Sequence, residues 1–127
     1  MLPQRYFAFD SSFVLPDDAA AGRAVIERVC REHEREIEED HYGVLIPYSF
    51  GPVPDVLKAL LAKRRPDLSS VDELVPDSWE SLQRLIRRFV DVGTTKFVVL
   101  PLEEPATADR WVAHLGEAAT ALKPLEV

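Results

Sequence analysis

The 127-residue chain has one cysteine, no long apolar run and no excess of basic residues, and each of these absences excludes a class of protein. Cys30 has no second cysteine with which to form an internal disulfide. No stretch approaches the length of about 18 apolar residues that a membrane-spanning helix needs. The 15 basic and 22 acidic residues give a net charge of −7, which disfavours nucleic acid or an anionic membrane as the main partner.

The N-terminal region also lacks the long apolar core of a secretory signal, because only the four residues 6–9 separate Arg5 from Asp10. Together with the missing disulfide, this predicts a cytoplasmic protein. What the chain does have is 46% apolar residues, enough to build a core. Its length is typical of a single domain, which we place at residues 1–127.

Three short apolar segments are predicted to be strands, at residues 6–9, 44–48 and 96–100. Pro47 lacks a backbone donor, so we expect it at the end of its strand. The last strand finishes with four consecutive apolar residues, Phe97 to Leu100. Because such a run has no polar face, it requires cover on both sides.

Apolar periodicity and capping residues predict four helices. Their expected limits are Asp17 or Asp18 to about residue 37, Pro54 to Pro66, Asp77 or Ser78 to Gly93, and Thr107 to Pro124. We expect one set of residues of the last helix to face inward, namely Trp111, Val112, Leu115, Ala119 and Leu122. The alternation of strands and helices predicts a parallel sheet with helical crossovers.

Three segments carry a resemblance to a known family: "FVLPDDAAAGRAVIERVCREHEREIEEDHYGVLIPY", "ELVPDSWESLQRLIRRFVDVGTTKFVVLPLEEP" and "KPLEV". They resemble the carboxyl-terminal part of the bacterial-luciferase-like family of flavin- and deazaflavin-dependent oxidoreductases, most specifically at Asp40–Gly43 and Gly93–Pro101. That family folds as a (β/α)8 TIM barrel, which takes about 250 residues. The resemblance implies a partial barrel of roughly the last three β/α units, with parallel strands and covering helices.

The resemblance also implies an oxidoreductase or monooxygenase that uses FMN or a deazaflavin. The amino-terminal strands that hold most of the cofactor and substrate in the family are not in this sequence, and Phe7-Ala8-Phe9 stands where many members carry Asp-Gly-Trp. We therefore expect no tight cofactor binding by this chain alone, and activity only when another chain completes the barrel. The substrate and the choice between the two cofactors stay open.

In a TIM barrel the working residues lie at the carboxyl ends of the strands. The candidate catalytic residues are Asp10, as a proton acceptor, and Tyr48, as a hydrogen-bond donor. Glu103 and Glu104 follow the last strand and should converge with them. The candidate cofactor-binding residues are Ser11, Ser12, Ser49, Arg64 and Arg65, the two arginines because a guanidinium pairs with phosphate oxygens. A structural interpretation is simpler for all of them, since Ser and Asp are common in turns and basic side chains favour helix ends.

No metal is predicted, because Cys30 and His33 share a helix face but no second ligand pair completes a site. Two hypotheses of function remain. In the first, the chain is the carboxyl-terminal portion of a luciferase-like oxidoreductase and needs a complementary barrel-half chain. In the second, it is a non-catalytic binding or structural module that covers its open strand edges by forming a homodimer.

Overall fold

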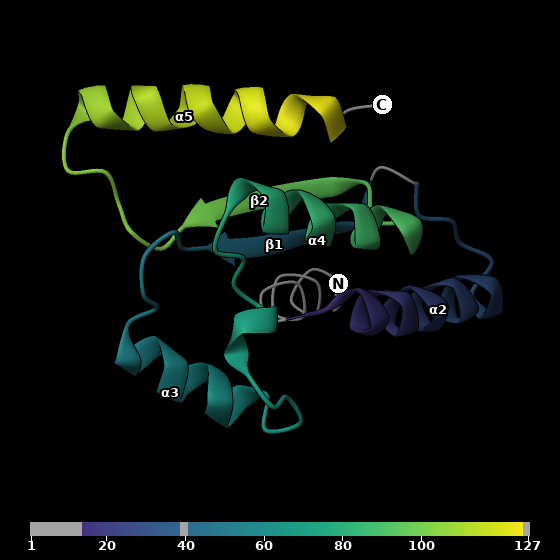
Figure 1. Ribbon diagram of the computed structural model, residues 1–127. Coiled ribbons are helices and arrows are strands. Elements are labelled where there is room, and N and C mark those ends of the chain that lie inside the picture. The colour runs from purple at the N-terminus through teal and green to yellow at the C-terminus, as the bar shows by residue number, and fades with distance from the viewer. Residues whose placement is uncertain (1–13, 39–40, 126–127) are drawn as a thin grey trace.

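The computed structural model describes residues 14–38 and 41–125. This part of the chain contains four α-helices and two strands (Figure 1). The helices are α2 (Pro16–Glu32), α3 (Asp55–Arg64), α4 (Trp79–Asp91) and α5 (Ala108–Leu122), and the strands are β1 (Gly43–Tyr48) and β2 (Lys96–Pro101). Two short 3₁₀ turns complete the order, η2 (Val71–Glu73) before α4 and η3 (Lys123–Leu125) after α5.

The two strands are parallel neighbours in a register that pairs Gly43 with Lys96 and Tyr48 with Pro101. The strands predicted at 44–48 and 96–100 are therefore confirmed. The strand predicted at 6–9 lies outside the described residues. Pro47 stands inside β1 rather than at its end, since the strand continues through Tyr48.

The predicted partial (β/α)8 barrel is wrong. Residues 14–38 and 41–125 form four helices around one two-stranded sheet, which is too few strands and too much helix for three β/α barrel units. Alternation of helix and strand sets the parallel direction of neighbouring strands, and every α/β architecture shares it. Curvature into a barrel depends on how many strands pair, which the alternation does not report.

Helix α4 supplies the main core of the molecule. Ser78 caps it by accepting a hydrogen bond from the Ser81 backbone N–H at 3.1 Å, so Ser78 is the cap among the two predicted candidates. The buried stripe of α4 consists of Leu82, Leu85, Ile86 and Phe89. This stripe packs on the face of β1 made by Val44, Ile46 and Tyr48. Each fully buried apolar side chain of this size stabilises the fold by about 1.5–3 kcal/mol.

The opposite face of the sheet is only partly covered. Register places Leu45 beside Val98 and Pro47 beside Leu100 on this face. Pro47 is buried, whereas Val98 is 59% exposed and Leu100 is 47% exposed. The strand that was predicted to need cover on both faces is thus covered on one.

Helix α5 packs less closely than its sequence predicts. It contacts α4 and η3, and Gln83 Nε2 on α4 donates to the Ala121 carbonyl at 2.6 Å. Its one buried residue is Ala118. The inward placement of Val112, Leu115 and Ala119 is wrong, because all three are exposed, Val112 by 71%. The apolar arc of α5 is wider than the surface available to cover it.

Two further elements complete the structure. Leu61 on α3 is buried in a small second cluster with Leu74 and Val75. Helix α2 buries only Pro16, and His33, which follows its last residue, is exposed. Across the described ranges, no helix is both long and apolar enough to cross a membrane.

Candidate functional site

The carboxyl ends of β1 and β2 meet at one edge because the strands are parallel. The Leu102 N–H donates to the Tyr48 carbonyl at 2.9 Å, which holds the two strand ends together. Ser49, which is buried, donates from Oγ to the Gly51 carbonyl at 2.9 Å. Glu103 lies over Gly51 so closely that a Cβ at Gly51 would be 3.3 Å from its Oε2. Tyr48 and Ser49 therefore lie near Glu103, while Asp10, Ser11 and Ser12 fall outside the described residues.

Four rings surround the tip of β1: those of Tyr48, Phe50, Trp79 and His114. Tyr48 Oη and His114 Nε2 are hydrogen-bonded at 2.5 Å, and their rings stack with centroids 5.8 Å apart. Trp79 lies 5.4 Å from Tyr48 and 4.7 Å from Phe50. Burial raises the pKa of the Tyr48 phenol, because the phenolate would lose its hydration. The hydroxyl therefore stays protonated at neutral pH.

This aromatic cluster is a packing device. Centroid distances of 4.7–6.4 Å are those of rings in mutual contact, so the rings fill the space between them. Tyr48 is 3% exposed, and its hydroxyl is committed to His114. The cluster fastens the middle of α5 to the end of β1. Sequence reasoning did not single out His114, although its spacing of three from Trp111 puts both on one helix face.

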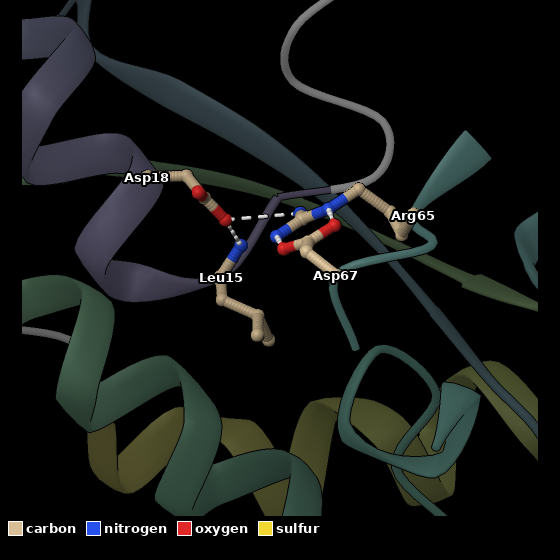
Figure 2. A network of polar contacts seen from close by, with 4 residues as sticks. All are labelled: Leu15, Asp18, Arg65 and Asp67. Carbon is tan, nitrogen blue, oxygen red and sulfur yellow. Dashed lines mark hydrogen bonds and ion pairs between the residues drawn. The ribbon is translucent and has the colours of Figure 1, made fainter. Parts of the chain in front are cut away.

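Arg65 is held by two carboxylates (Figure 2). Its guanidinium donates to Asp18 at 3.0 Å and to both carboxylate oxygens of Asp67 at 2.9 and 3.0 Å. Asp18 also accepts from the Leu15 N–H at 2.8 Å, at the start of α2. The hydrogen bonds from Arg65 lower the pKa of Asp67, and the one to Asp67 is the main cause that raises the pKa of Arg65. Arg65 thus joins the start of α2 to the end of α3, and a phosphate would have to displace both carboxylates.

Arg64, the other arginine predicted to bind a cofactor, ends α3 and is exposed. In the part of the chain that the structure describes, no three His, Cys, Asp or Glu side chains gather into a group able to hold a metal ion. The chain matches no protein-family model, no curated protein and no solved structure. Its function has to be inferred from its own surfaces.

A hollow beside the sheet lies along β2. This β2 groove has a volume of about 690 Å³ and lies between α4, β2 and the end of α5. Its lining is mostly apolar: Ile86, Val90, Thr94, Thr95, Phe97, Val99, Leu122 and Leu125. In Figure 1, α5 runs above the sheet on the side of β2. An apolar groove next to a sheet edge is a surface on which an extended chain segment binds.

Proposed function

We propose that this chain is a self-associating, non-catalytic binding module whose assembly covers β2. The observation that carries the proposal is the exposure of β2: Val98 is 59% and Leu100 is 47% exposed on one face. Its other face borders the apolar β2 groove. Parallel strands are normally covered on both faces, and open strand edges pair with other chains. A second copy supplies this cover without another gene product, and twofold dimers are the commonest solution.

The flavin-dependent activity implied by the resemblance stays a prediction, as do FMN or deazaflavin as its cofactor and a barrel-half chain as its partner. Tyr48, Ser49 and Glu103 do come together at the carboxyl edge. However, Tyr48 is enclosed by three other rings and bonded to His114. This enclosure supports a structural role at that edge more than a catalytic one.

Sedimentation equilibrium of the purified chain tests the proposal. We expect a mass about twice 14.3 kDa at micromolar concentration. Because each copy carries a net charge of −7, raising the salt concentration should strengthen association by screening the repulsion between copies. A mass of one chain at all concentrations and salt levels would contradict self-association.

A cofactor titration separates the two hypotheses. We expect neither FMN nor a deazaflavin to remain with the chain through gel filtration. A yellow protein that keeps its chromophore would instead support the oxidoreductase hypothesis, whatever its oligomeric state.

A further inference from the structure

The backbone hydrogen bonds show which groups of β2 face the edge with which no other strand in residues 14–38 and 41–125 pairs. The Lys96 N–H donates to the Tyr42 carbonyl at 3.0 Å, and the Leu102 N–H donates to the Tyr48 carbonyl at 2.9 Å. In a parallel ladder, alternate residues direct both backbone groups to the same neighbour. Residues 96, 98, 100 and 102 therefore face β1. Phe97 and Val99 direct their backbone N–H and carbonyl groups to the opposite edge. Pro101 directs its carbonyl there.

The outer edges of the two strands differ in what they offer to another chain. On β1, Pro47 faces outward by the same alternation and has no N–H to donate. On β2, Phe97 and Val99 both retain an outward N–H and an outward carbonyl. The proline of β2, Pro101, comes only at the last residue of the strand. The β2 edge is therefore the better template for an added strand.

The β2 edge is complementary to a second copy of itself in antiparallel orientation. With Phe97 of each copy opposite Val99 of the other, each pair exchanges both of its backbone hydrogen bonds. Moving the register by two residues would place Pro101 opposite Phe97, and one hydrogen bond of each pair would be lost because proline lacks the donor. The register that places Phe97 opposite Val99 uses the outward N–H of both residues.

Side chains support the same register. Phe97 and Val99 lie on the face that borders the β2 groove, so the same two residues of the second copy would extend this apolar layer. Pairs of an aromatic with a β-branched residue are favourable across antiparallel strands. Val98 would lie opposite Val98 of the second copy, which reduces its exposure.

Charge favours the antiparallel direction. Lys96 opens β2, and Glu103 and Glu104 follow its last residue. Antiparallel pairing brings the basic start of each strand toward the acidic end of the other. Parallel pairing would set like charges side by side.

Building on the proposed self-association, we propose that two copies join by antiparallel pairing of their β2 strands about a twofold axis at Val98, which gives a continuous four-stranded sheet. In this arrangement Val98 and its counterpart form a non-hydrogen-bonded pair. The Cα atoms of such a pair are about 4.5 Å apart, which is within the range for a disulfide.

Cysteine crosslinking tests the register. The variants Val98→Cys, Leu100→Cys and Val112→Cys are each made in a Cys30→Ser background and oxidised under mild conditions. Leu100 is the matched control on the same strand and face, and Val112 is an exposed apolar residue on α5. We expect Val98→Cys to form a covalent dimer at least about tenfold faster than both controls, because only its thiols meet across the axis. Circular dichroism confirms that all three variants are folded.

Each other outcome is decisive. Faster crosslinking of Leu100→Cys would mean a shifted register, and faster crosslinking of Val112→Cys would mean an interface on α5; either result overturns this inference. Slow crosslinking of all three in a chain that sediments as a dimer would reject β2 pairing and leave the proposed function standing. Slow crosslinking in a chain that sediments as a monomer would reject both.

Discussion

The chain contains two successive helix–turn–strand units, α2 followed by β1 and α4 followed by β2, in which burial is distributed in opposite ways. In the first unit the helix buries only Pro16, while the strand is mostly buried. In the second unit the helix buries four apolar residues, while every residue of the strand is at least partly exposed. Burial differs between the two units because the apolar stripe of α4 packs on the face of β1, whereas α2 contributes the half-buried Ala19 to this core.

The turns that end the two helices have the same hydrogen bonds but a different residue at the position of positive φ. Helix α2 ends in a Schellman motif, in which the Arg35 N–H donates to the Cys30 carbonyl at 2.8 Å and Glu34 has a φ of 53°. Helix α4 ends in the same motif, in which the Thr94 N–H donates to the Phe89 carbonyl at 3.0 Å and Gly93 has a φ of 98°. The positive φ favours glycine, so the first turn carries backbone strain that the second avoids.

The largest expected difference in the free energy of unfolding is between substitutions on α4 and on α2. Phe89→Ala on α4 should lower the free energy of unfolding by about 3–5 kcal/mol, because the ring is fully buried against β1. Val29→Ala on α2 should lower it by less than about 0.5 kcal/mol, since Val29 is 41% exposed. Urea unfolding at one protein concentration measures both. Equal losses would mean that the two helices are buried alike.

The next comparison concerns the strands. Ile46→Ala on β1 should cost about 2–5 kcal/mol, because Ile46 is 2% exposed and contributes to the main core. Leu100→Ala on β2 should cost less than about 1 kcal/mol, because its side chain keeps much of its contact with water. Thermal unfolding of the two variants gives the difference. A larger loss for Leu100→Ala than for Ile46→Ala would contradict the burial of these two side chains within one copy.

Introducing glycine at one turn and removing it at the other should change the free energy of unfolding in opposite directions. Glu34→Gly should stabilise the fold by about 0.5–1 kcal/mol by removing the strain of a positive φ. Gly93→Ala should destabilise it by about 1–2 kcal/mol, because it introduces that strain. The new methyl group would also displace Arg23, which donates to the Gly93 carbonyl at 2.6 Å. Two unfolding curves decide this, and a stabilising Gly93→Ala would contradict the account.

The smallest expected effect is on the tether between α2 and α3, which consists of the hydrogen bonds of Arg65 with Asp18 and Asp67. Arg65→Lys keeps the charge but loses the forked geometry to Asp67, so we expect the Tm to fall by about 2 °C at pH 7. Arg87→Lys, at an exposed position on α4, is the control for the same chemical change and should leave the Tm unchanged.

The pH dependence of the tether follows from Asp67. Its pKa in the folded chain lies below the ordinary value of 3.8, so its contribution to stability is present above that pH. The contribution is lost as the pH falls through the lowered pKa. The difference between Arg65→Lys and the unchanged chain should therefore shrink in acid. A difference that stays constant down to pH 2 would mean that Asp67 is not the partner that matters.

Local features of this protein were readable from its sequence. The strands at 44–48 and 96–100, a cap at Asp77 or Ser78 and the stop at Gly93 depend on residues close together in the chain. Side-chain period and capping chemistry report such features directly. The approach of Tyr48 and Ser49 to Glu103 at the carboxyl edge of the sheet was also predictable from the sequence, because it requires only that the two strands be parallel.

The sequence by itself determined which segments become helices and strands and which sides of them are apolar. The tertiary structure decided which of those sides are covered. Val112 on α5 and Val98 on β2 belong to apolar segments just as the buried residues of α4 do, yet both remain exposed. Tyr48 meets His114 across 66 residues, and Arg65 meets Asp18 across 47. Periodicity reports the direction of a side chain relative to its own backbone, whereas cover, strand number and such contacts depend on which distant segments pack together.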